Sequence, residues 1–192
     1  MATAYPLGRL RPSVDTHRSW AERVQRPWAD NQDQGKPGVV TDVVTVDGLR
    51  KSYGDLKAVD GLSFSLAEGE VFALLGPNGA GKTTTVEILE GYLERSAGTV
   101  SVLGFDPERG GRAMRERIGI VLQESGFDEE FQVIEIVTMY CGFYPRRRDP
   151  DQVLALVGLS DKRDAKIKTL SGGQRRRLDL ALGLVGDPEL LF

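Results

Sequence analysis

The sequence predicts an α/β fold with a mostly parallel core sheet, an antiparallel β-portion and a helical insert. Residues 71–75 (VFALL) form a continuous apolar run, which is typical of a strand buried on both faces of a sheet. Residues 43–46 and 62–66 are β-branched or alternate between apolar and polar, which indicates two half-buried strands. From about residue 125 to residue 169 the character of the sequence is helical.

The remaining predicted elements are shorter. Residues 99–103 and 118–122 are expected to be strands, and residues 190–192 resemble the start of one more. Helices are expected over residues 82–92, 133–144, 150–157 and 171–185. The third of these has a clear start signal, because Asp149 is a good N-cap and Pro150 suits the first turn of a helix.

Residues 1–38 differ in amino-acid composition from the rest of the chain. They mix Pro, Arg, Gln, Asp and Gly with few aliphatic residues, which predicts a disordered N-terminal extension. The folded domain is therefore expected to span residues 39–192. His17, the only histidine, lies in the extension, and it is given no role because a mobile tail cannot hold a catalytic geometry.

The bulk composition narrows the classes of partner. A net charge of −3 over 192 residues gives no electrostatic reason to expect nucleic acid or an anionic membrane surface. The arginine runs at 146–148 and 175–177 are interpreted as surface charge facing solvent or neighbouring carboxylates. No run approaches the ~18 apolar residues that cross a bilayer. The single cysteine, Cys141, is expected to be a small buried apolar residue.

A phosphate-binding loop follows the apolar run 71–75. The pattern G-x-x-x-x-G-K-[ST] is matched by Gly76, Pro77, Asn78, Gly79, Ala80, Gly81, Lys82 and Thr83, with Thr84 next in the helix. Glycines let the backbone N–H groups turn inward around a phosphate, and the helix N-terminus adds its positive dipole end. Lys82 is expected to reach the β- and γ-phosphates, and the Thr83 hydroxyl to bind Mg²⁺.

A second glycine-rich motif opens the predicted helix at residues 171–185. It consists of Leu170, Ser171, Gly172, Gly173 and Gln174. A serine N-cap, two glycines with accessible N–H groups and a helix dipole together make an anion site. A plain linker or helix start explains the same residues equally well, so the motif alone does not decide between these interpretations.

The two motifs, in this order and at this spacing, resemble the ABC ATPase family, whose signature motif is LSGGQ. Gln123 matches the glutamine of the family's Q-loop, and Tyr53 matches the aromatic residue that stacks on adenine. Taken alone, Tyr53 would also suit a core position in a strand. The stretches 75–87 and 174–178 look most similar to the ATPase subunits of bacterial drug exporters.

The resemblance implies a function as well as a P-loop NTPase fold of ABC type. Such domains hold ATP and Mg²⁺ between the P-loop of one copy and the signature of a second copy, and they drive membrane permease subunits from the inner face of the cell membrane. Gln123 would then join the Mg²⁺ shell and the attacking water, with Thr83 as the other metal ligand. Residues 124–130 are where we expect the permease to make contact.

The sequence also departs from the family pattern. Residues 190–192 match the start of the Walker B strand, and the aspartate, catalytic glutamate, D-loop and switch histidine that follow in the family are not among the 192 residues. His17 lies on the wrong side of the P-loop to replace that histidine. Two alternatives stay open: a non-transport ABC protein acting on ribosomes or DNA, and a non-catalytic binding module or gene fragment.

Residues 1–192 by themselves are therefore expected to bind MgATP without turning it over. Thr83 and Gln123 supply only neutral oxygens, and phosphoryl transfer needs carboxylates to fix the metal and polarise the attacking water. Phosphate release by this chain should fall to background, compared with a version extended through a complete Walker B strand, D-loop and switch histidine. Equal rates from the two proteins would contradict the expectation.

Overall fold

The computed structural model describes residues 42–122, 126 and 128–192. The predicted N-terminal extension, residues 1–38, lies outside the described residues, and so does Gln123. No helix within the described ranges combines the length and the apolar character that a bilayer crossing requires.

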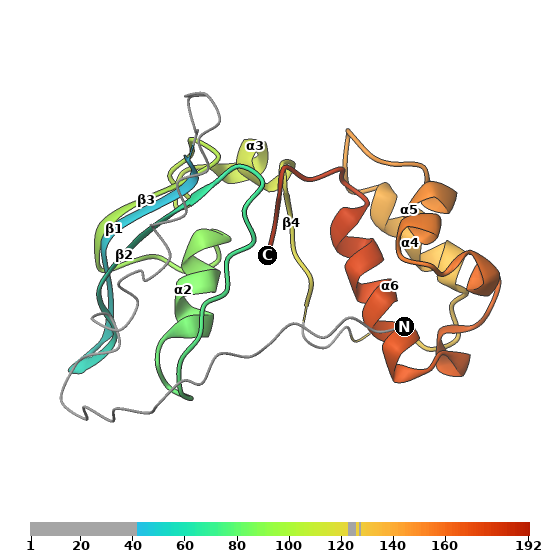
Figure 1. Ribbon diagram of the computed structural model, residues 1–192, viewed down its shortest axis with the longest axis horizontal. Helices are drawn as coiled ribbons and strands as arrows, with labels where there is room; N and C mark the ends of the chain where they lie inside the picture. Colours follow the sequence, from blue (N-terminus) through green and yellow to red (C-terminus); the bar gives the residue numbers. More distant parts are fainter. Residues whose placement is uncertain (1–41, 123–125, 127) are drawn as a thin grey trace, which may run out of the picture. The chain divides into compact units, whose positions relative to one another are not determined.

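Three antiparallel strands form the first sheet (Figure 1). Strands β1 (Asp42–Tyr53) and β2 (Leu56–Ala67) make a hairpin, and β3 (Ala97–Val102) pairs with the other edge of β1. The hairpin turns through two residues, of which Gly54 comes first and has φ 58°, a backbone conformation that glycine adopts without strain. The antiparallel β-portion predicted from the sequence is thus confirmed.

One face of this sheet packs against helix α2 (Lys82–Leu89). Val44, Val46 and Leu49 of β1 are buried, although a regular alternation would bury residue 48. The register shifts between Val46 and Leu49, and Gly48 sits there with φ 59°. This irregularity turns Leu49 into the core, where it is fully buried, as is Ile88 of α2.

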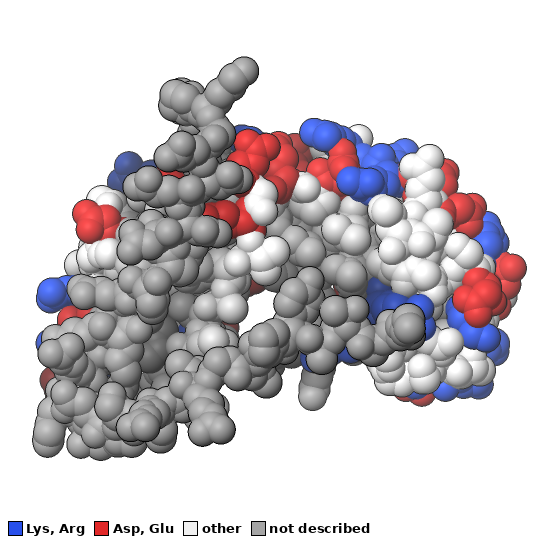
Figure 2. Space-filling model, in the orientation of Figure 1, with Lys and Arg blue, Asp and Glu red and all other residues white. Residues whose placement is uncertain are grey.

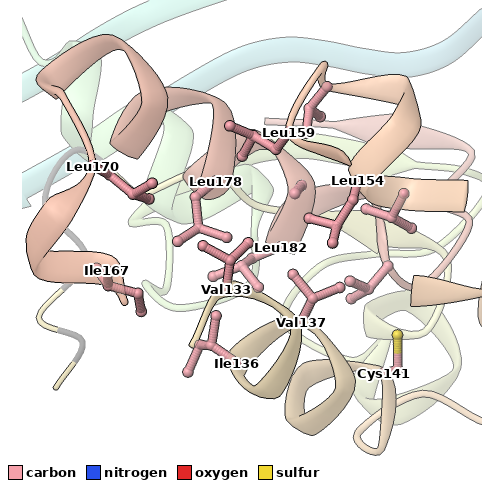
Figure 3. Close-up of a cluster of buried hydrophobic side chains, with 14 residues drawn as sticks. Val133, Ile136, Val137, Cys141, Leu154, Leu159, Ile167, Leu170, Leu178 and Leu182 are labelled. Carbon is pink, nitrogen blue, oxygen red and sulfur yellow. The ribbon is translucent and has the colours of Figure 1, made fainter. Parts of the chain in front are cut away.

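Helices α4 (Val133–Cys141), α5 (Pro150–Leu156) and α6 (Gly172–Leu184) share a second core (Figure 3). The carboxylate of Asp149 accepts the N–H groups of residues 151 and 152, which confirms the predicted N-cap of α5. Two 3₁₀ turns, Ser160–Lys162 and Ile167–Thr169, connect α5 to α6. The shared core consists of Val133, Ile136, Val137, Cys141, Val153, Leu154, Val157, Leu159, Ile167, Leu170, Leu178, Ala181, Leu182 and Val185.

A short parallel pair follows the small helix α3 (Gly111–Arg115). Strand β4 (Ile118–Gly119) pairs with β5 (Leu190–Leu191), so the strand predicted at residue 190 is confirmed. Among the described residues, parallel pairing is limited to these two strands. A Cβ at position 119 would lie 2.1 Å from the carbonyl oxygen of Gly183, so glycine is required where β4 meets the end of α6.

The prediction of a strand at residues 71–75 was wrong. These residues are not in a strand, and Val71, Phe72 and Leu75 are 101%, 41% and 76% exposed. Phe72 stacks on Phe64 of β2, with ring centroids 4.7 Å apart. An apolar run favours burial, but a strand forms only where a neighbouring strand accepts its hydrogen bonds, and none of the described strands pairs with this segment.

The N-terminus of α2 lies directly on strand β2. Gly81, the N-cap, has φ 77°, and its carbonyl oxygen accepts both the backbone N–H and the hydroxyl of Thr85 at 2.8 Å. A Cβ at Gly81 would come within 2.3 Å of the carbonyl oxygen of Ala58. The backbone approaches β2 so closely that only glycine fits.

Gly81→Ala should therefore destabilise the protein far more than Gly79→Ala does. Gly79 has the same backbone region, φ 82°, but open space around its Cβ position, so alanine there costs only backbone strain of roughly 1–2 kcal/mol. Alanine at 81 adds a backbone clash, and we expect a total loss of about 3 kcal/mol or more. Urea denaturation of both variants measures the difference, and equal losses would contradict the close approach.

Glu90, just after α2, is a buried carboxyl group. It is 9% exposed, and burial, together with the neighbouring Glu87, raises its pKa from 4.5 to about 7. The folded chain thus holds a proton at Glu90 that the unfolded chain releases above pH 4.5.

The free energy of unfolding should accordingly fall between about pH 4.5 and pH 7 and then stay level, as far as Glu90 contributes. Glu90→Gln removes this contribution, so the variant should gain on the order of 1–3 kcal/mol over wild type at pH 8 relative to pH 4.5. Urea titrations at both pH values test this. Glu68→Gln, at an exposed position, should follow wild type throughout.

Candidate functional site

The predicted phosphate loop enters helix α2 through two glycines with positive φ. Gly79 and Gly81 have φ values of 82° and 77°, and the N–H of Ala80 donates to the carbonyl oxygen of Pro77 at 3.2 Å. No side chain caps the first turn of α2, because its N-cap residue is glycine. The free N–H groups and the positive dipole end of the helix therefore face the inside of the loop, where an anion would lie.

Lys82 already lies over this loop. Its Nζ donates to the carbonyl oxygens of Gly76 and Pro77, each at 2.8 Å. These two bonds hold the ammonium group at the place that the motif assigns to it, in contact with the loop that would surround the β-phosphate. A bound phosphate would offer it a full negative charge in addition to these neutral carbonyl oxygens.

The threonines after Lys82 divide into two kinds. Thr85 is fully buried and fixed to Gly81, whereas Thr83 is exposed in the first turn of α2. An exposed hydroxyl beside a phosphate site suits Mg²⁺, which takes few protein ligands and is otherwise held by phosphates and water. The described residues contain no cluster of three His, Cys, Asp or Glu side chains that could hold a metal by itself. The residues present thus fit a metal ion that arrives with the nucleotide.

Tyr53 lies at the end of the β1–β2 hairpin, paired with Leu56. Its side chain is 49% exposed, so it does not belong to the core, and the Nζ of Lys51 lies 5.0 Å from the centre of its ring. Ala58, whose carbonyl contacts Gly81, is only two residues beyond Leu56 on the same strand. The residue paired with Tyr53 thus lies about 7 Å along β2 from the residue that contacts Gly81.

The second motif begins helix α6. The hydroxyl of Ser171 accepts the N–H of Gln174 at 3.3 Å, and the side chain of Gln174 accepts the N–H of Ser171 at 2.8 Å, which makes a capping box. Gly172 and Gly173 are exposed, and a Cβ at either would meet nothing within 4 Å. Among the described residues, packing does not require these glycines, and the missing side chains leave the N–H groups of the first turn accessible.

The two motifs do not meet within one chain. No hydrogen bond or ion pair joins residues 76–84 to residues 171–174 in the part of the chain that the structure describes. Strand β2 carries both the residue paired with Tyr53 and the contact with Gly81, while the exposed motif at Ser171 begins a different helix. Gln123, the third predicted element of the site, lies outside the described residues.

The arginines after the motif make specific contacts that the sequence reasoning missed. Arg175 pairs with Glu129 at 2.6 Å, Arg176 donates to the carbonyl oxygen of Leu122 at 3.4 Å, and Arg177 donates to that of Gly158 at 2.8 Å. Arg175 and also Arg176, which lies 3.9 Å from Asp179, make the carboxylate pairings expected of surface arginines, whereas the bonds to backbone carbonyl oxygens were not expected. Three successive helical residues point about 100° apart, and this spread was the one signal that they reach different partners.

Comparison with known proteins agrees with this geometry. The profile of the ABC transporter family matches residues 59–192. The chain is 44% identical over 154 residues to a daunorubicin resistance ATP-binding protein of Streptomyces coeruleorubidus, covering 78% of this chain and 49% of that protein. It is 41% identical over 162 residues to a Nod factor export ATP-binding protein of Ralstonia nicotianae, covering 81% of this chain and 50% of the relative.

Solved structures show the same fold. An ATP-binding cassette of an ABC transporter in its ADP conformation superposes with a TM-score of 0.68 at 24% identity, over 79% of this chain and 67% of that one. The Clostridium perfringens protein cbiO1, part of an ABC transporter complex, gives 0.68 at 29% identity, over 78% and 64%. The chain spans about half the length of the curated relatives it matches. Its match to the family profile over residues 59–192 shows that it belongs to the ABC transporter family of ATP-binding proteins.

Proposed function

We propose that this chain is the ATP-binding motor part of an ABC exporter, coupling ATP binding and hydrolysis to the export of a small molecule such as a drug. The observation that carries the proposal is the phosphate loop, in which an uncapped helix N-terminus and the ammonium of Lys82 converge. The names of the relatives, which export Nod factor or confer daunorubicin resistance, support an exporter.

In this proposal each part of the nucleotide has its own contact. The loop from Gly76 to Thr84 surrounds the phosphates, with Lys82 as the cation, and the accessible ring of Tyr53 stacks on adenine. Mg²⁺ is held by Thr83 and Gln123, and when bound it neutralises charge on the phosphate oxygens. The protein's contribution is to fix the phosphates in place, since positioning and electrostatics dominate phosphoryl transfer.

A second copy of an ABC ATPase domain completes the site. Ser171, Gly172, Gly173 and Gln174 form an outward-facing anion-binding turn with no nucleotide of its own chain to serve. We propose that this turn binds the γ-phosphate held by the opposite P-loop. Such a pair would sit on membrane permease subunits at the cytoplasmic face, with residues 124–130 in contact with the permease. No nucleic acid partner is part of the proposal.

Lys82→Ala tests whether the phosphate loop binds nucleotide as proposed. It removes the only side-chain cation in the described loop, so detectable MgATP binding should be lost, as measured by isothermal titration calorimetry. Lys57→Ala is the matched control, because Lys57 is an exposed lysine that pairs with Asp60. Equal MgATP affinity of the Lys82 variant and wild type would contradict the proposed site.

A further inference from the structure

Residues 129–132 and 166–168, which are far apart in sequence, run side by side just before the turn at residues 171–174. The N–H of Ile167 donates to the carbonyl oxygen of Phe131 at 3.0 Å, and the N–H of Lys168 donates to that of Glu129 at 3.1 Å. Gln132 and Lys166 form a further antiparallel bridge. The chain that leads into α4 is thus joined, backbone to backbone, to the chain that leads into Ser171.

Charged side chains reinforce the same junction. Glu130 accepts the ammonium groups of Lys166 at 2.8 Å and Lys168 at 2.6 Å, which lowers its pKa to about 2 and keeps the carboxylate ionised at neutral pH. These bonds connect the two stretches to each other but do not reach helix α6. Figure 2 shows that acidic and basic side chains alternate over the helical part of the molecule on the face in view.

Arg175 is the residue that extends the junction to the signature helix. Its Nη1 bonds to the Glu129 carboxylate at 2.6 Å, and its Nε lies 3.5 Å from the carbonyl oxygen of Leu170, the residue before the Ser171 N-cap. One guanidinium group therefore contacts the stretch before α4 and the start of the anion-binding turn together. The planar fork of arginine suits such a double contact, whereas lysine offers a single charged point.

A second attachment lies on the other side of Gln123 in sequence. Arg176 donates to the carbonyl oxygen of Leu122, which directly precedes Gln123. The described residues on both sides of Gln123, Leu122 and Glu129, are thus bonded to successive residues of the signature helix. A displacement of either one changes the forces on the first turn of α6.

We propose that Arg175, through Glu129, is a positioning residue that holds the anion-binding turn at Ser171 in register with the stretch where we expect the permease contact. The functional consequence rests on the proposed function: a shift of residues 124–130 would move the turn at residues 171–174, which is proposed to bind the nucleotide of the opposite chain. The contact itself is a property of the single chain and is tested there.

The experiment is hydrogen–deuterium exchange on the full chain without nucleotide, with the amides of residues 174 and 175, which donate to Ser171, as readout. Glu129→Gln and Arg175→Gln should each speed exchange there by about five-fold, the size expected for loss of one partly exposed ion pair. The melting temperature should fall by no more than about 4 °C, because the loss of one ion pair leaves the core shared by α4, α5 and α6 intact. Arg175→Lys, which keeps the charge but loses the fork, should restore only part of the protection.

Two controls isolate the pair. Glu130→Gln breaks the bonds to Lys166 and Lys168 but leaves Arg175 paired, so exchange at residues 174 and 175 should match wild type. The double variant Glu129→Gln/Arg175→Gln should loosen the turn no more than Arg175→Gln alone, because both substitutions remove the same interaction. Unchanged exchange in both single variants, or additive effects in the double variant, would overturn the proposal.

The proposed function is checked separately on the same proteins. MgATP affinity should stay within about two-fold of wild type in every variant, because Arg175 belongs to the signature helix and not to the P-loop. Failure of wild type to bind MgATP would refute the proposed function, while the exchange comparison would still decide the role of Arg175.

Discussion

The contact between Gly81 and the carbonyl of Ala58 is the constraint on which the nucleotide site depends. It seats the N-terminus of α2 on strand β2 at a distance that no side chain would permit. Tyr53, the last residue of β1, pairs with Leu56 of the same strand β2, so the aromatic residue and the phosphate loop are attached to one hairpin. The bulge at Gly48 serves this arrangement too, because it turns Leu49 inward, where the buried face of the sheet supports α2.

The helical group has a different physical character. Its interior is a continuous apolar core from α4, α5 and α6, which resists deformation because close-packed side chains have few alternative arrangements. The turn at residues 171–174 begins α6 and follows the buried Leu170, so it is anchored to this core. The contacts of α6 with the stretch before α4 are instead partly exposed ion pairs and single hydrogen bonds, each worth about 0–1 kcal/mol.

Most elements could be predicted from the sequence because their signals are local. Asp149 before Pro150, and Ser171 three residues before Gln174, act as caps within a single turn, and the structure shows both. Residues 71–75 show the limit of such local signals. Apolar character indicates that a segment prefers burial, but whether it forms a strand depends on another strand that can pair with it. The partners of Arg175 and Arg176 lie 46 and 54 positions away, and no local pattern encodes contacts at that separation.

The sequence predicted the residues of the candidate site. The structure adds that they fall into two groups, one at the start of α2 and one at the start of α6. A P-loop with its own cation and an accessible ring forms one half, and a capped, outward-facing turn forms the other. The second motif contains no lysine, so what it offers a phosphate is backbone N–H groups and neutral side chains. In the proposed pair, each interface would combine the P-loop of one chain with the signature of the other. The division of the motifs is therefore a physical reason for the pairing that the family resemblance implies.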